Sequence, residues 1–129
     1  MKLNYKTFGE GEPLLILHGL FGSLDNWQTI GKKLAETYQV FLIDLRNHGK
    51  SPHSNSFCYH EMATDVEELI ADNNLNKVNL LGHSMGGKTA MTFAVEYPHL
   101  LAKLIVVEQP EPGALIKRLY APPGWSSFT

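Results

Sequence analysis

The sequence predicts an α/β fold, in which a mostly parallel sheet of about four buried strands carries helices on both faces. Four short apolar runs, at 14–17, 40–43, 78–81 and 104–107, are continuous rather than alternating, as is typical of strands that are buried on both faces. The segments between these runs carry helical signals, so strand and helix alternate along the chain. Such alternation favours right-handed crossovers between parallel strands.

Each of the three segments between the apolar runs predicts a helix. The first has an apolar stripe at helical spacing over 27–34, and Asp25 is placed to cap it. The second has a similar stripe over 62–70. The third begins near Met85 and is stopped by Pro98, because proline cannot continue a helix.

The two ends of the chain depart from this alternation. Residues 2–8 predict a short edge strand, and the glycines and proline of 9–13 predict a turn. From residue 109 onward the chain holds four of its seven prolines and no strand pattern. We therefore expect one unit over 1–108 and a proline-rich tail over 109–129, which is irregular except for a short helical turn around 115–119.

Composition excludes several classes of function. Eleven Lys and Arg against 13 Asp and Glu give a net charge of −2 with no basic run, so a nucleic-acid partner is not expected. The N-terminus lacks the apolar segment of a secretory signal, and no apolar run approaches the roughly 18 residues of a membrane span. The sequence thus predicts a cytoplasmic protein. Cys58 is the single cysteine, without an activating pattern around it, and we expect a half-buried, unreactive thiol.

The segment GHSMGGKT at 82–89 fits two unrelated catalytic patterns. As G-x-S-x-G it is the turn that raises a nucleophilic serine, Ser84, above a hydrolase sheet. As G-x-x-x-x-G-K-[ST] it is a phosphate-binding loop with Lys88 as its lysine, which would make the protein an NTPase. A phosphate loop keeps several residues outside regular structure, whereas the nucleophile turn enters its helix directly after the serine. The sequence does not show which of the two forms.

The segment HGLFG at 18–22 favours the hydrolase. Acyl transfer passes through an oxyanion, which needs two N–H donors at about 2.7 to 3.1 Å from the developing charge. One donor comes from the residue after the nucleophile, here Met85, and the other from the loop after the first buried strand. Glycines in this loop let the backbone approach a substrate closely. A plain turn between strand and helix is the alternative for this segment.

Three blocks together carry a resemblance to a known family. HGLFGS at 18–23, DLRNHGKSPHS at 44–54 and GHSMGGKT at 82–89 resemble the small acyl esterases of the α/β-hydrolase superfamily, in that family's order. The resemblance covers residues 12–107 and implies the N-terminal half of an α/β-hydrolase fold. It implies a serine esterase that cleaves small-molecule esters or thioesters through an acyl-enzyme, without a metal or other cofactor. The same group commonly has Lys and Thr after its serine turn, so the phosphate-loop pattern is interpreted as a coincidence.

The motif and the resemblance together assign roles to individual residues. Ser84 would be the nucleophile, and the amide of Leu20, or less favourably of Phe21, would share the oxyanion with that of Met85. Phe21 fits the lining of an acyl pocket and the core equally well. The resemblance implies that residues 46–48 belong to a structural loop, which braces the turn that carries the oxyanion donor, and do not take part in catalysis.

The general base is missing from this set. The family's order is serine, acid, histidine, and the only histidine after Ser84 is His99. His99 lies at the far end of the intervening helix, roughly 20 Å away at about 1.5 Å per residue, so it cannot be the base. Glu108 ends the fourth buried strand, where the resembled esterases often carry an aspartate, and is a candidate acid. A plain carboxylate at a strand end is the alternative.

The resemblance further implies that the chain stops where the second half of the fold would begin, which would leave an open apolar edge along 104–107. Three explanations fit: a truncated protein, one piece of a homodimer or of a complex whose other chain covers the edge, or a degenerate domain. The third explanation gives the alternative function, a catalytically inert ligand-binding or interaction module that retains the serine turn.

Overall fold

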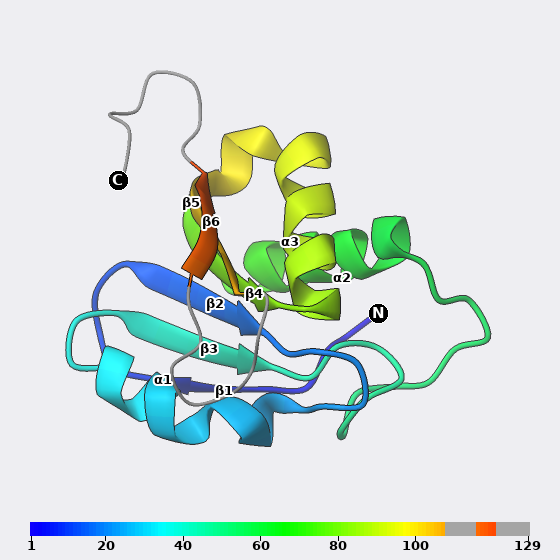
Figure 1. The fold of residues 1–129 in the computed structure, drawn as a ribbon, viewed down its shortest axis with the longest axis horizontal. Helices are drawn as coiled ribbons and strands as arrows, with labels where there is room; N and C mark the ends of the chain where they lie inside the picture. The colour runs from blue at the N-terminus through cyan, green and yellow to red at the C-terminus, as the bar shows by residue number, and fades with distance from the viewer. Residues whose placement is uncertain (108–115, 121–129) are drawn as a thin grey trace.

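A computed structural model of the protein describes residues 1–107 and the backbone of 116–120. It contains one six-stranded sheet in the order β1-β3-β2-β4-β5-β6 (Figure 1). The four predicted strands are present and pair in parallel in the order β3-β2-β4-β5, which confirms the α/β class. The strands are β1 (Tyr5–Phe8), β2 (Pro13–Leu17), β3 (Gln39–Ile43), β4 (Val78–His83), β5 (Leu101–Val107) and β6 (Ile116–Tyr120).

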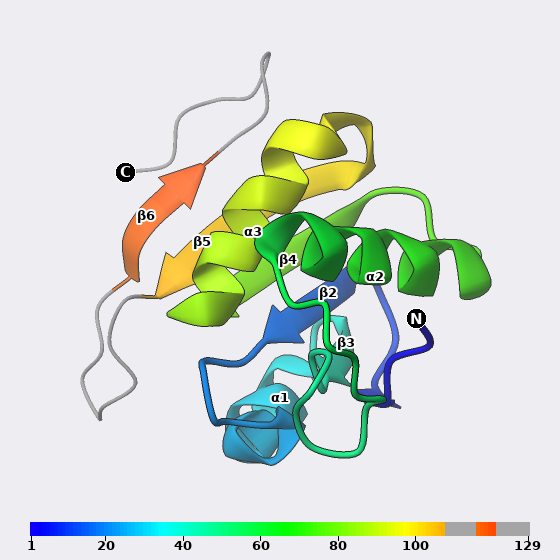
Figure 2. The ribbon, with the colours of Figure 1, turned by 90° about the vertical axis from the view of Figure 1, so that its right-hand side faces the viewer.

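Helices cover both faces of the sheet, as predicted. Figure 2 shows α2 and α3 together on one face, and α1 lies on the other. None of the helices in the described ranges is long and apolar enough to cross a membrane. The helices are α1 (Gln28–Leu34), α2 (Tyr59–Asp72) and α3 (Met85–Glu96), with short 3-10 helices η1 (Leu24–Trp27) before α1 and η2 (Pro98–Leu100) after α3.

The central strands pack against helices on both faces, which explains their continuous apolar runs. In β2, Leu15 and Leu17 belong to the core beneath α2 and α3, whereas Leu14 and Ile16 belong to the core beneath α1. The same alternation holds in β3. Because successive strand residues point to opposite faces, a strand between two helical layers must be apolar at every position.

The cap of the first helical segment differs from the prediction. Ser23, not Asp25, is the N-cap: its hydroxyl accepts the N–H of Asp25 at 3.3 Å. The Asn26 side chain returns a bond to the N–H of Ser23 at 2.9 Å, which completes a capping box. The prediction was wrong because the helical stripe begins at Trp27, whereas a 3-10 turn extends the helical backbone to Leu24.

Strand β6 pairs with the edge of β5, which was predicted from the sequence to be open. β6 runs antiparallel to β5, and Leu104 lies opposite Tyr120 and Val107 opposite Ile116. The predicted helical turn around 115–119 is therefore wrong. An unpaired parallel edge presents a row of backbone N–H and C=O groups, and pairing with it outweighs a weak local preference. The rest of the predicted tail, at 109–115 and 121–129, lies outside the described residues.

Helix α3 has a buried face and an exposed face, so the contribution of the core to stability can be tested by substitutions on each face. The side chain of Phe93 is completely buried, whereas Val95, two residues further on, is 81% exposed. We expect Phe93→Ala to lower the free energy of unfolding by about 3–5 kcal/mol, because it removes a buried ring and leaves a cavity. Val95→Ala should change it by less than about 0.5 kcal/mol. Urea denaturation followed by circular dichroism measures both, and similar losses for the two variants would contradict this packing.

Candidate active site

Ser84 is the single residue between a strand and a helix. β4 ends at His83 and α3 begins at Met85, so the chain turns at Ser84 alone, with φ of 54° and ψ of −113°. The N–H of Ser84 donates to the carbonyl of Val107 at 3.2 Å, which fastens the turn to the end of β5. A phosphate-binding loop would need several residues outside regular structure at this point. The local structure is instead the turn of the hydrolase pattern.

Two glycines make this turn possible because backbones meet there. A Cβ atom on Gly82 would overlap the carbonyl of Gly86, and a Cβ on Gly86 would overlap the carbonyl of Leu17 at the end of β2. The first turn of α3 therefore lies directly on the carboxyl ends of β2 and β4. Ser84 is thereby held, exposed, at the edge of the sheet where ligands bind in α/β folds.

The segment after β2 forms a tight turn beside Ser84. The N–H of Gly22 donates to the carbonyl of Gly19 at 3.0 Å, and Phe21, the third residue of the turn, has φ of 61°. A Cβ atom on Gly19 would lie 2.8 Å from Nδ1 of His83, so the turn packs against the residue that precedes Ser84. We call residues 19–22 the oxyanion turn, after the role that the resemblance implies for them.

Two histidines hold the oxyanion turn from below. His18 is fully buried; its Nδ1 lies 2.7 Å from the carbonyl of Gly19, and its Nε2 accepts the N–H of Leu45 at 3.0 Å. His48 places Nδ1 2.9 Å from the carbonyl of Arg46, and its Nε2 accepts the N–H of Phe21 at 3.1 Å. In both rings a carbonyl faces Nδ1, so the proton is assigned there and Nε2 is free to accept.

Residues 45–54 follow β3 and form what we call the bracing loop, in which Arg46 and Asn47 bond to groups other than Ser84. The Arg46 guanidinium makes two hydrogen bonds to the Asp65 carboxylate, at 2.7 and 2.9 Å, and a third to Glu61 at 2.6 Å. The hydrogen bonding of Arg46 to the Asp65 carboxylate is the largest cause that raises the pKa of Arg46 above its ordinary value. Asn47 accepts the N–H of Ser54 at 2.7 Å. These contacts tie the loop to α2 and to itself, which is the structural role that the resemblance implied.

Asp44 directly follows β3 and connects the bracing loop with η1, which precedes α1, and with the N-terminal segment. Its carboxylate accepts the N–H groups of Leu24 at 2.8 Å and Lys50 at 3.0 Å, and the side chain of Asn4 at 2.9 Å. Burial alone would raise the pKa of Asp44, but these hydrogen bonds outweigh it and hold the pKa below its ordinary value. Asp44 is thus an ionised anchor for three segments and has no contact with Ser84 in the described structure.

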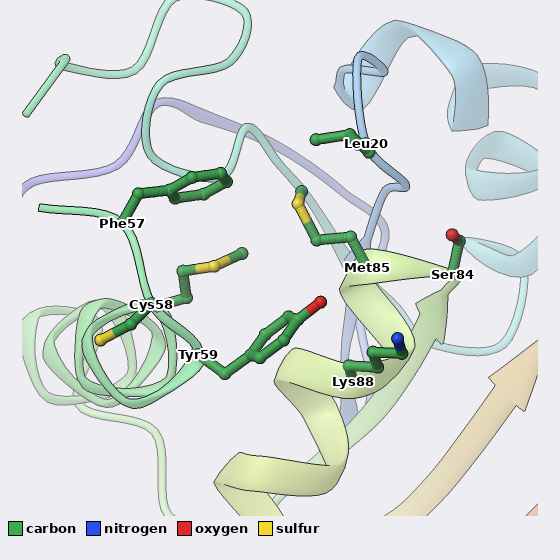
Figure 3. A pocket seen from close by; sticks show the side chains of 8 residues that line it. Leu20, Phe57, Cys58, Tyr59, Ser84, Met85 and Lys88 are labelled. Carbon is green, nitrogen blue, oxygen red and sulfur yellow. The ribbon is translucent and has the colours of Figure 1, made fainter. Parts of the chain in front are cut away.

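Two hollows lie on either side of Leu20. The first, about 350 Å³ in volume, has Ser84 and Lys88 on one side and residues 57–59 on the other, with Met85 beside them (Figure 3). Leu20 and Met62 complete its lining. The second, about 440 Å³, includes the oxyanion turn, Asn26, Trp27, Ile30 and His83.

Phe21 and Cys58 are both more exposed than the sequence suggested. Phe21 lines the second hollow with 92% of its surface exposed, so it does not belong to the core. Cys58 was predicted to be half-buried, and this is wrong: the thiol is exposed at the first hollow, with Sγ 3.7 Å from Glu61. It immediately precedes α2, where the chain leaves an exposed loop, and no hydrophobic periodicity marks such a position.

Among the described residues, the structure brings Leu20 and Met85 together with Ser84, but no base. In the described part of the chain, no side chain makes a hydrogen bond to the hydroxyl of Ser84. His99 lies in η2, beyond the far end of α3, as predicted. Glu108 lies outside the described residues. Within these residues no group of three His, Cys, Asp or Glu side chains is arranged to hold a metal ion.

A parallel sheet whose central strand ends in a one-residue serine turn defines an α/β hydrolase. The chain belongs to this family: the sequence profile of the alpha/beta hydrolase fold matches residues 12–128. The predicted family and fold class are thereby confirmed.

Relatives of the chain include proteins named as esterases and lipases. A "Putative esterase/lipase" of Haemophilus influenzae is 50% identical over 74% of this chain and 33% of the relative. The "sn-1-specific diacylglycerol lipase ABHD11" of Danio rerio is 45% identical over 84% of this chain and 36% of the relative. A solved structure, "Marine microorganism esterase", matches 87% of this chain and 46% of that one, with a TM-score of 0.80 and 48% identity. The chain spans about a third of the length of these curated relatives.

The close contact of Gly86 with the end of β2 can be tested by comparing alanine substitutions at Gly86 and at the adjacent Gly87. Gly86→Ala should lower the free energy of unfolding by at least about 1–3 kcal/mol, because the new methyl group meets the backbone of β2, which cannot move aside. In Gly87→Ala the methyl group would lie 3.0 Å from the Cγ1 atom of Val106, a side-chain atom that can shift. Alanine also favours a helix over glycine by about 1 kcal/mol. Urea midpoints should therefore fall for the first variant only.

Buried histidines make the stability depend on pH. Burial lowers the pKa of His18 from its ordinary value of 6.5, although the hydrogen bond to Gly19 acts in the opposite sense; burial also lowers the pKa of His83. The unfolded chain therefore binds protons that the folded chain does not, so stability present above about pH 6.5 is lost as the pH falls. Between about pH 7.5 and 5.5, above the range where carboxylates titrate, the free energy of unfolding should decrease.

Urea titrations at both pH values measure this dependence. His18→Asn should weaken it, because the variant has one fewer buried imidazole that resists protonation. His53→Ala changes an exposed histidine and should leave the dependence as it is. A wild-type stability that does not change across this range would contradict the assignment of neutral buried histidines.

Proposed function

We propose that this chain supplies the nucleophile and the oxyanion donors of a serine esterase that cleaves carboxylic esters or thioesters through an acyl-enzyme. The observation that carries the proposal is the turn at Ser84, where a strained, exposed serine stands alone between β4 and α3 at the edge of a hollow. Strained backbone persists only where the surrounding packing enforces it, and it gathers at functional sites. The esterases and lipases among the relatives support the same chemistry.

The proposed reaction begins with attack of the Ser84 hydroxyl oxygen on the carbonyl carbon of the ester. A C–O bond forms, the hydroxyl proton passes to a base, and the carbonyl electron pair moves onto oxygen. Collapse of this oxyanion expels the alcohol or thiol and leaves an acyl-enzyme, which water then hydrolyses. Splitting the cleavage into two steps avoids direct attack by water, a poorer nucleophile.

Leu20 and Met85 are the proposed oxyanion donors. The N–H of Phe21 is already bound by His48, whereas the N–H of Leu20 has no acceptor among the described residues. Met85 is the first residue of α3, so its N–H has no carbonyl four residues earlier within the helix. The helix dipole also favours negative charge at this end. These observations favour Leu20 over Phe21.

No base is bonded to the Ser84 hydroxyl among the described residues, which include all six histidines of the sequence. A serine needs an imidazole within about 2.6 to 3.2 Å to take its proton. His18 and His48 are both committed to the oxyanion turn and the bracing loop, and neither is bonded to Ser84. Glu108 directly follows β5, whose end is bonded to Ser84 through Val107, and it stays the candidate for the acid that orients the base.

The first hollow is the proposed site for the acyl group. Its side chains are mainly apolar, with Leu20, Phe57, Met62 and Met85 facing the space beside Ser84. A volume of about 350 Å³ falls at the lower end of the range for small-molecule sites, which is about 300–1,000 Å³. This lining suits an aliphatic or aromatic acyl chain of modest size.

Intact-mass spectrometry after incubation with a fluorophosphonate tests the proposal. We expect an adduct on the wild-type chain and none on Ser84→Ala, because the probe phosphonylates a nucleophilic serine with loss of fluoride. Cys58→Ala is the matched control: it removes the thiol of the same hollow and should label like the wild type. Without the base the reaction should be slow, with only the residual advantage of about 10³–10⁴ over water.

The alternative function predicts a different pattern. An inert binding or interaction module would show no adduct on the wild type even after prolonged incubation. An adduct that persists in Ser84→Ala would place the reactive group elsewhere. Either outcome would remove Ser84 as the nucleophile of this chain.

A further inference from the structure

Phe21 has a backbone conformation that its side chain does not explain. Four described residues other than glycine have positive φ: Phe21, Asn47, Asn74 and Ser84. Asparagine adopts this region readily, whereas a bulky aromatic residue there is an outlier. Because the Phe21 side chain is 92% exposed, burial of the ring does not compensate for the strain. The contacts that hold the residue must therefore be those of its backbone.

The positive φ of Phe21 defines the direction of one peptide group. A turn with positive φ at its third residue has the geometry of a type II turn, a position at which glycine is usual. A type I turn has negative φ there, suits most residues, and differs by a flip of the central peptide. In the oxyanion turn this peptide joins Leu20 to Phe21, and its N–H is the group that His48 accepts.

His48 is itself held in place as a neutral acceptor. Its exposed fraction is 9%, Nδ1 faces the carbonyl of Arg46, and the ring lies 5.0 Å from that of His18 and 6.0 Å from that of Phe57. The Arg46 side chain is bound in turn to α2. The hydrogen bond from the Phe21 N–H to this fixed acceptor therefore stabilises the turn in its strained conformation.

The charged groups around His48 are engaged elsewhere. The Asp44 carboxylate accepts two backbone N–H groups and the side chain of Asn4, and the Arg46 guanidinium points to Asp65 and Glu61. On the β2 side, the Nε2 atom of His18 is bound to Leu45. None of these described groups donates to or accepts from Nε2 of His48, which faces the N–H of Phe21.

We infer that His48 is a positioning residue whose Nε2 atom holds the Leu20–Phe21 peptide in its strained orientation and so fixes the shape of the turn that carries the Leu20 amide. Without an acceptor at this position, the turn relaxes toward the form with negative φ at Phe21. The catalytic consequence rests on the proposed function, whereas the state of the turn does not.

Amide NMR tests the turn independently of any catalysis. In ¹⁵N–¹H spectra at neutral pH, the wild-type Phe21 amide should have the downfield shift and slow exchange of a bonded N–H. His48→Gln should keep the bonded signal, because its side-chain carbonyl can accept. His48→Leu should show a released signal, and His53→Ala should behave like the wild type.

The rate of fluorophosphonate labelling at Ser84 gives the catalytic readout. We expect His48→Leu to label about 10- to 100-fold more slowly at neutral pH, a smaller effect than the about 10²–10³ of losing an oxyanion donor outright. His48→Gln should restore most of the rate and should keep the bonded Phe21 signal. A merely structural role would not give this rescue.

The two proposals fail in different ways. An unlabelled wild type whose Phe21 amide still follows His48 would overturn the esterase proposal and leave the turn mechanism standing. Labelling at Ser84 with a Phe21 amide that is unchanged in His48→Leu would overturn the inference. If His48→Leu does not fold, the exchange of the Phe21 amide in the wild type and in His48→Gln decides it, since a rapidly exchanging amide in the wild type would overturn the inference.

Discussion

The contact of helix α3 with the ends of β2 and β4 is the constraint on which the rest of the site depends. Gly82 and Gly86 carry no Cβ, so the first turn of the helix rests directly on the backbone at Leu17. A helix that starts so close to the sheet leaves one residue for the change of direction. Ser84 therefore takes a positive φ, and its side chain is left exposed where strand and helix meet. Strain at the serine is a consequence of packing beneath it.

The oxyanion turn and the loop after β3 depend on a second layer of polar contacts. His18, Asp44 and His48 connect the ends of β2 and β3 with the turns that follow them, and Arg46 extends the network to α2. Buried polar groups are costly unless they are bonded, so a network of this kind permits few alternative arrangements. Rigid support of this kind is what preorganised hydrogen-bond donors require, because they must not reorganise as charge develops.

Local patterns in the sequence predicted most of the sheet. They failed where the conformation of a segment depends on contacts with a distant part of the chain. The apolar runs of β2 to β5 were recognisable because a strand between two helical layers is apolar at every position. β6 was missed because Ile116–Tyr120 acquires its conformation by pairing with β5, a contact that short-range periodicity does not contain. The cap at Ser23 was missed for a similar reason, since the helical backbone begins ahead of the apolar stripe.

The sequence by itself determined the family and the alternation of strands and helices over 1–107, because motif spacing and continuous apolar runs are local features that close packing requires. Only the tertiary structure decided which amide of the oxyanion turn is free. That depends on His48, 27 residues away from Phe21 along the chain, accepting one N–H and leaving the other. It also decided between the two patterns of GHSMGGKT, since the difference lies in where α3 begins, and the packing of that helix on β2 sets its first residue.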